Sequence, residues 1–340
     1  MHFRFWKTAE LVGCPPVSIQ ANMAVSYFFI HVCLALENIG FFQELGSKKK
    51  SVHELAGTLG MSESILMSLI DFLAATSRII EKNGDLVSVR QAQLPNSLWV
   101  IQAYRPVFEG LVALLKGEKV YGKDVVRDGY YLQKASDIFS GDAIRLALSL
   151  IEDDKATLID FGCGSGESLV AFCRKNNSRT AVGLDIDPVI VAAARRHAEE
   201  FLLQKRIGIF QADVADIGQW SARISPIEPN IFLASTMLHE FLRDGECSVI
   251  DFLARLKSAF PRSRLIVIEF DGIPFDRLHA EADPGRRHFA AMYQLWHPLT
   301  NQGMPQPRAV WMRILSTAGW AVRGTHDAKH NLVVFDCVSG

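Results

Sequence analysis

The sequence predicts an α/β protein in which a doubly wound, mostly parallel sheet follows a smaller, mostly helical N-terminal domain. Three observations lead to this fold class. From residue 156 onward, short apolar runs alternate with helical patterns, as the strand–helix repeats of such a sheet require. One of these runs ends in a glycine-rich turn. Residues 51–89 instead carry two short helical patterns and a hairpin pattern, which indicate a separate unit.

The N-terminal domain begins with a long apolar segment. Residues 19–45 form a nearly all-round apolar helical pattern, more than one small domain would cover by itself. Ser51 and Glu54 form a capping-box pattern that opens a helix ending at Leu59. Ser62 is expected to cap a second helix that runs through Ala75. The strand patterns 79–82 and 86–89 flank an Asn-Gly-Asp turn. Helix, turn, helix and hairpin together predict a winged helix.

The charge of this predicted winged helix argues against a role on DNA. Its second helix has no Lys or Arg over residues 63–71, so nothing there would meet phosphates. We therefore interpret the domain as a homodimerisation module whose apolar helix packs against a second chain. A further helix is expected over 97–117. The expected domains are a dimerisation domain (1–95), a helical connector and substrate lid (96–150) and a catalytic domain (151–340).

The turn after the first apolar run of the C-terminal half indicates a ligand. The run 158–161 includes Asp160 and leads into three glycines at alternate positions, which are Gly162, Gly164 and Gly166. Such glycines permit a tight turn and a close approach of the backbone to a ligand. Asp185 ends the next apolar run, nineteen residues after the last glycine. An acid at that strand end can accept both hydroxyls of a ribose, which predicts a nucleoside-binding crevice.

The glycine spacing indicates which class of nucleoside-containing ligand binds at the turn. It is G-x-G-x-G rather than the dinucleotide G-x-G-x-x-G, and no Walker lysine follows. This arrangement resembles motif I of S-adenosylmethionine (SAM) methyltransferases, and the resemblance implies their class I Rossmann-like sheet. Asp185 matches their ribose acid, Asp213 the residue beside the adenine, and Ser235 ends their fourth strand. The resemblance assigns the cofactor to Asp160, Gly162, Gly164, Gly166, Asp185, Asp213 and Ser235.

The strand ends should converge on one crevice, because ligands of such sheets bind outside the carboxyl ends of the strands. Glu269 is expected there beside the cofactor residues. The expected strands are 157–161, 180–185, 207–211, 230–235, 264–270 and a final pair near 319–325 and 331–337.

Composition limits the partners and the location. The chain has 340 residues, 49% of them hydrophobic and 21% charged, and a formal charge of −1. It is thus an ordinary globular protein without a basic field, and we expect no nucleic acid or membrane partner. We also expect a cytoplasmic location, because no secretory leader pattern is visible. Six scattered cysteines are expected to be reduced: Cys14, Cys33, Cys163, Cys173, Cys247 and Cys337.

Two histidine segments narrow the reaction. His239 follows the fourth strand in a Leu-His-Glu-Phe segment, and His297 lies in a His-Pro-Leu-Thr-Asn-Gln segment. With Arg127 in Val-Val-Arg-Asp-Gly, they resemble the C-methyltransferases of 2-oxo acids, a similarity that extends over nearly the full length. The resemblance implies β-carbon methylation of phenylpyruvate, 2-ketoarginine or a similar acid through a metal-chelated enolate, in the biosynthesis of a non-standard amino acid for a secondary metabolite such as an antibiotic.

The same resemblance suggests roles for these residues. His239 and His297 would bind a divalent metal, iron or zinc, which acts as a Lewis acid. Arg127 would clamp the substrate carboxylate. Asp244 or Glu240 would orient His239 from behind. Plainer roles stay open for each residue: a cap or packing role for His239, a helix end for His297 and a solvated position for Arg127.

Two other functions remain possible on the sequence alone. The first is a metal-free O-methyltransferase of small molecules, with His239 as general base, since the pKa of histidine lies near neutrality. The second is a winged-helix regulator that senses SAM, against which the uncharged second helix argues. Activity with and without a chelator would separate the two enzymatic hypotheses.

Overall fold

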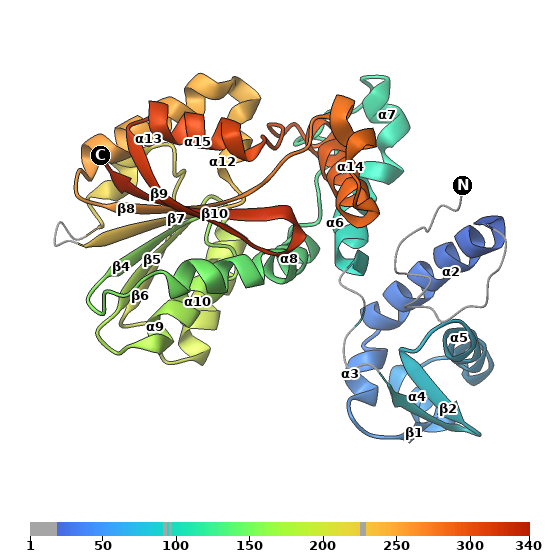
Figure 1. Cartoon of the computed structure of the whole chain (residues 1–340). Helices are drawn as coiled ribbons and strands as arrows, with labels where there is room; N and C mark the ends of the chain where they lie inside the picture. Colours follow the sequence, from blue (N-terminus) through green and yellow to red (C-terminus); the bar gives the residue numbers. More distant parts are fainter. Residues whose placement is uncertain (1–18, 91–93, 95–96, 225–228) are drawn as a thin grey trace. The chain divides into compact units, whose positions relative to one another are not determined.

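A computed structural model describes residues 19–90, 94, 97–224 and 229–340 (Figure 1). Cys14 lies outside the described residues. The chain divides into two compact units, Met1–Gln102 and Ala103–Gly340. No helix among the described residues is long and apolar enough to cross a membrane.

The apolar segment of the first unit is two helices instead of one. The helix α2 (Ile19–Asn38) is followed by the short helix α3 (Phe41–Leu45). Gly40 between them has φ 77°, a left-handed conformation that ends a helix and that glycine adopts without steric cost. The expectation of one helix over 19–45 was therefore wrong at this glycine.

The rest of the first unit follows the expected order. Ser51 and Glu54 form the capping box of α4 (Val52–Leu59). Ser62 stands at the N-cap of α5 (Glu63–Thr76), but its hydroxyl contacts Ser64 and caps no backbone N–H. The hairpin strands are β2 (Ile80–Asn83) and β3 (Leu86–Val89), and β1 (Lys50–Ser51) adds a third strand in the order β1-β3-β2.

The second unit is built on a seven-stranded sheet of order β6-β5-β4-β7-β8-β10-β9. The first five of its strands in chain order run parallel, and β10 is antiparallel to both neighbours. This is the predicted Rossmann-like fold class, and the strands lie within two residues of the expected ranges. They are β4 (Thr157–Phe161), β5 (Thr180–Asp185), β6 (Ile207–Gln211), β7 (Asn230–Ser235), β8 (Arg264–Phe270), β9 (Trp320–Asp327) and β10 (Leu332–Ser339).

Helices cover both faces of this sheet and enclose two apolar cores (Figure 1). Successive side chains of a strand point to opposite faces. In β4, Leu158 accordingly enters one core, while Ile159 and Phe161 enter the other. The first core packs under α8 (Gly129–Ser149), α9 (Glu167–Lys175) and α10 (Pro188–Glu200), and the second under α11 (Ile217–Ser221), α12 (Leu238–Phe241), α13 (Glu246–Ala259) and α15 (Arg308–Thr317).

The expected helix over 97–117 is also interrupted. It forms α6 (Ser97–Glu109) and α7 (Leu111–Leu115), which Gly110 separates. A Cβ at Gly110 would lie 3.1 Å from the Val125 side chain, so the glycine lets the following connector pack closely. The remaining segments are η1 (Leu242–Asp244), η2 (Phe275–Ala280), α14 (Pro284–Leu299) and η3 (Lys329–Asn331).

Candidate active site

The glycine-rich turn after β4 is built from backbone that only glycine adopts easily. Gly162, Gly164 and Gly166 have φ values of 66°, 53° and 77°, all in the left-handed region. The N–H groups of Gly162 and Cys163 both donate to the Leu184 carbonyl of β5, at 2.8 and 3.0 Å. The turn is therefore fixed against the neighbouring strand, and α9 begins directly after it.

The acid at the end of β5 contacts this turn. The Gly164 N–H donates to Asp185 Oδ2 at 3.1 Å, and the Asp187 N–H donates to Oδ1 at 3.0 Å. Burial raises the pKa of Asp185 despite these hydrogen bonds. Ile186 and Val189, which follow Asp185 in the chain, leave most of their apolar surface exposed. The glycine turn, the acid and this apolar surface suit a nucleoside with a free ribose.

The other predicted cofactor residues lie in different surroundings. Asp213 is exposed after β6 and accepts from the Ala215 N–H at 2.9 Å, and Ser235 is half-buried at the end of β7. Asp160 is buried, and the Ser168 hydroxyl of α9 donates to it. Burial raises the pKa of Asp160 to about 7. The structure thus shows Asp160 joining β4 to α9 in the interior.

His239 lies at the start of the segment after β7. It occupies α12, is 2% exposed and faces Glu269 of β8, which is fully buried. Glu269 accepts from the His239 backbone N–H at 3.1 Å and contacts Nδ1 at 2.9 Å. Burial lowers the pKa of His239, but the charge and hydrogen bond of Glu269 outweigh it and the pKa is raised overall. Because the carboxylate holds a proton on Nδ1, Nε2 is left to act on a ligand.

His297 faces His239 from the last turn of α14. The ring centroids are 4.9 Å apart. His297 is 1% exposed, its Nδ1 contacts the Tyr293 carbonyl, and its Nε2 is buried without a hydrogen-bond partner. Burial, followed by the charge of His239, lowers the pKa of His297 to about 3. The ring is therefore neutral near pH 7, with an unused lone pair on a buried nitrogen.

Arg127 lies in the segment before α8, and its hydrogen bonds to described residues go to neutral oxygen atoms. Its Nε donates to the Tyr121 hydroxyl at 2.9 Å, and Nη1 donates to the Tyr104 hydroxyl at 3.3 Å and to Gln302 Oε1 at 3.2 Å. Gln302 in turn donates to Glu240 at 2.6 Å. Within the described residues no carboxylate forms an ion pair with Arg127. A half-buried guanidinium of this kind is available to an anion.

One predicted role is corrected by the structure. The carboxylate that orients His239 is Glu269, whereas Glu240 contacts Gln302 and Asp244 is exposed and pairs with Arg243 at 3.3 Å. Asp244 is separated from the histidine because the chain turns outward in η1. A signal for Glu269 was present in the sequence, since it is the only acid in the apolar run 265–270 and a charge in a buried strand needs a partner.

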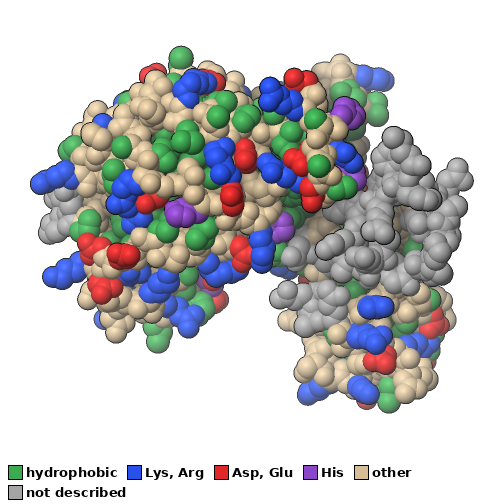
Figure 2. Space-filling view, in the orientation of Figure 1, with side chains coloured by type: hydrophobic (Ala, Val, Ile, Leu, Met, Phe, Trp, Pro, Cys, Tyr) green, Lys and Arg blue, Asp and Glu red, His purple; other side chains and the backbone are tan. Residues whose placement is uncertain are grey.

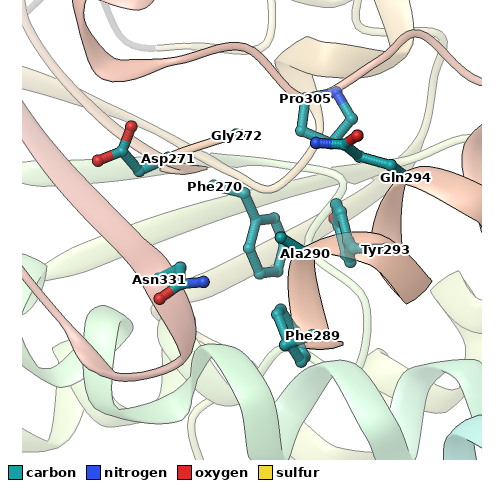
Figure 3. A pocket seen from close by; sticks show the side chains of 9 residues that line it. All are labelled: Phe270, Asp271, Gly272, Phe289, Ala290, Tyr293, Gln294, Pro305 and Asn331. Carbon is teal, nitrogen blue, oxygen red and sulfur yellow. The ribbon is translucent and has the colours of Figure 1, made fainter. Parts of the chain in front are cut away.

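Aromatic side chains close the space behind the two histidines. Tyr293 lies with its ring centroid 4.3 Å from that of His297 and 3.8 Å from that of Phe270. Figure 3 shows Phe270, Phe289 and Tyr293 around a cavity of about 10 Å³, which Gln294 also lines. Such a volume holds about one water molecule. On the face of the second unit that Figure 2 shows, positive and negative side chains are interspersed.

The predicted metal ligands His239 and His297 lie side by side, but they do not form a complete metal site. Nδ1 of His239 contacts Glu269, Nδ1 of His297 contacts the Tyr293 carbonyl, and Nε2 of His297 has no hydrogen-bond partner among the described residues. Among the described residues, however, no cluster of three or more His, Cys, Asp or Glu side chains is placed to hold a metal. The chain therefore offers two nitrogen ligands here, and any others would come from substrate or water.

Comparisons with known proteins identify the class of enzyme. A methyltransferase domain model matches residues 158–228. The chain is 27% identical over 300 residues to a 2-ketoarginine methyltransferase of Streptomyces arginensis, covering 84% of this chain and 82% of the relative. It is 27% identical over 230 residues to an indolepyruvate C-methyltransferase of Streptomyces griseus, covering 64% and 65%. The chain is a SAM-dependent methyltransferase.

The fold of this methyltransferase is also found among solved structures. An O-methyltransferase family protein of Burkholderia thailandensis superposes with a TM-score of 0.68 at 19% identity, and the match covers 96% of this chain and 99% of the other. At this identity the likeness concerns the fold, including a mostly helical N-terminal region before the Rossmann-like sheet.

Proposed function

We propose that this methyltransferase transfers the methyl group of SAM to the β-carbon of a 2-oxo acid in secondary metabolism. The observation that carries the proposal is the pair His239 and His297, two buried imidazoles whose ring centroids lie 4.9 Å apart, with Nε2 of His297 buried and without a hydrogen-bond partner among the described residues. The names of the two Streptomyces relatives, both of which concern 2-oxo acids, support the same reaction.

Arg127 would bind the carboxylate of such a substrate. Its guanidinium is held by two phenols and an amide, so its direction is set before any ligand arrives. A carboxylate can accept two parallel N–H bonds from this planar fork. Prior alignment matters because a methyl transfer depends mainly on the alignment of carbon, methyl and sulfur.

The two histidines would hold a divalent cation, iron or zinc, next to that carboxylate. When bound, such a cation supplies Lewis-acid polarisation of a chelating 2-oxo acid. The chain's own contribution would be to keep the Nε2 atoms of both histidines unprotonated. Glu269 holds the proton of His239 on Nδ1, and the burial that lowers the pKa of His297 to about 3 keeps that ring neutral.

One observation favours a second function. The charge of Glu269 raises the pKa of His239 against the effect of burial, and a carboxylate–imidazole pair is also a good general base. In this alternative the enzyme methylates a hydroxyl group without a metal, and His297 has no ligand role.

Methyl transfer from labelled SAM would separate the two. We expect a β-methyl product from phenylpyruvate, 2-ketoarginine or 4-methyl-2-oxovalerate, identified by NMR, and we expect a strong chelator or His297→Ala to abolish it. The matched control is His279→Ala, because His279 is exposed in η2. If a hydroxyl substrate is methylated instead, and both the chelator and His297→Ala leave the rate intact, the metal proposal is wrong.

We also propose that the first unit dimerises. Met23, Tyr27 and Phe28 of α2 are each more than half exposed, an apolar surface that a second chain would cover. Residues 1–95 would then serve as the dimerisation domain and 96–150 as connector and lid. Light scattering that gives the mass of one chain would contradict the dimer.

A further inference from the structure

The helix α8 contacts the glycine turn through one of its faces. Gln133 and Asp137 are four residues apart and so lie on the same side of the helix, and the Gln133 amide donates to Asp137 Oδ1 at 2.8 Å. The Ser165 hydroxyl of the turn donates to the same oxygen at 3.2 Å. A Cβ added to Gly164 would lie 2.7 Å from Gln133 Cδ, so the glutamine rests directly on the turn.

Asp137 has hydrogen bonds but no cation. Its described partners are the neutral side chains of Gln133 and Ser165. No Lys, Arg or His among the described residues forms an ion pair with it. The charges that act on it are those of Glu167, which opposes its ionisation, and of His197, which favours it. Burial raises the pKa of Asp137 above its usual range. A half-buried carboxylate in this setting would be stabilised by a positive group.

Two carboxylates therefore touch adjacent residues of the turn from different elements. Asp185 contacts Gly164, and Asp137 contacts Ser165. Asp185 has the position of a ribose acid at a strand end. A ligand that lies across the turn with its ribose at Asp185 would bring its other end to α8. In SAM that other end is an amino acid, which carries an ammonium and a carboxylate group.

We propose that Asp137 binds the ammonium of the amino-acid end of SAM. Gln133, now resting on Gly164, turns aside when the cofactor enters, and its amide then donates to the cofactor's carboxylate. The helix before the glycine turn thus recognises the part of the cofactor that the nucleoside residues do not reach. The inference depends on the SAM cofactor only, and it stands whichever substrate the enzyme methylates.

The proposed ammonium contact can be tested by measuring the affinity of two ligands by calorimetry, without any methyl transfer. S-adenosylhomocysteine has the nucleoside, the thioether and the amino acid, whereas 5′-methylthioadenosine lacks the amino acid. We expect Asp137→Asn to weaken S-adenosylhomocysteine binding about 10- to 100-fold, since a charge-assisted hydrogen bond is lost. Binding of 5′-methylthioadenosine should change less than about twofold. The matched control is Asp142→Asn, because Asp142 lies further along α8 and pairs with Arg145 and Lys329.

Two results would overturn the proposal. Equal losses for both ligands would mean that Asp137 only supports the turn, and no loss for either would mean that it does not contact the cofactor. Should Asp137→Asn fail to fold, the ligand can be altered instead. The wild-type enzyme should bind the deaminated analogue of S-adenosylhomocysteine, which lacks only the ammonium group, at least about tenfold more weakly, and equal affinity would reject the ammonium contact.

Discussion

The two halves of the candidate site are constructed in different ways. The cofactor half, at β4 and β5, consists largely of backbone: left-handed glycines and N–H groups that bond to the next strand. The substrate half consists of side chains from segments far apart in the chain, with Arg127 before α8, His239 after β7, Glu269 in β8 and His297 in α14. A backbone site depends on a few adjacent residues, whereas a side-chain site depends on the packing of the whole second unit.

The largest effect is expected from a variant that removes one contact from the proposed substrate half alone. Glu269→Gln keeps the size of the side chain but loses the charge that holds the proton of His239 on Nδ1. We expect kcat/KM to fall about 10- to 100-fold, as for other residues that orient a working histidine. Calorimetry should show S-adenosylhomocysteine binding unchanged.

The control for that variant is Asp244→Asn, because Asp244 is exposed and pairs only with its neighbour Arg243. It should keep activity within about twofold, as surface pairs contribute little. If Asp244→Asn were the more damaging change, the assignment of Glu269 as the partner of His239 would have to be abandoned.

A smaller effect is expected from breaking the cofactor half. Gly164 has φ 53°, so alanine there costs about 1–2 kcal/mol of backbone strain and its Cβ meets the movable end of Gln133. We expect Gly164→Ala to weaken S-adenosylhomocysteine binding about tenfold. Gly141→Ala is the control, because Gly141 lies inside α8 and its Cβ would find ordinary contact 3.6 Å from Arg145. Unchanged binding in Gly164→Ala would show that the turn tolerates a side chain.

The smallest effect is expected at Asp160. Burial raises the pKa of this carboxyl from 3.8 to about 7. The folded protein therefore holds a proton that the unfolded chain releases, so Asp160 lowers the free energy of unfolding as the pH rises from about 4 to about 7. Asp160→Asn, which stays neutral, should raise Tm at pH 8 by about 3 °C. At pH 4 the two proteins should melt together. A lower Tm for the variant at both pH values would mean that the ionised carboxylate is needed.

The difference between the halves also explains what the sequence could predict. The parallel strands were placed correctly because β4, β5, β6, β7 and β8 are short, separate apolar runs. The turn was recognised because its glycines stand at alternate positions within one short segment of the chain. The predicted metal ligands and Arg127 were chosen by resemblance, and their roles stay predictions.

What the sequence could not predict depends on tertiary contacts. Gly40 and Gly110 end helices, yet Gly57 lies within α4 and Gly141 within α8, so the residue type alone does not decide where a helix stops. Similarly, Glu240 and Asp244 are closer to His239 in the chain than Glu269 is. The pairing of β7 with β8 is what brings Glu269 beside His239.

The position of α8 has a consequence for how the two ligands affect each other's affinity. The helix begins two residues after Arg127, and its second and third turns carry Gln133 and Asp137 to the glycine turn. The helix start at Gly129 and Gln133 lie about 6 Å apart along a stiff axis, so a displacement at the helix start would be felt at the turn. Under the two proposals, cofactor binding at Asp137 and anion binding at Arg127 would share one free energy of coupling. Linkage makes that coupling reciprocal: the factor by which SAM tightens the hold on the acid equals the factor by which the acid retains SAM.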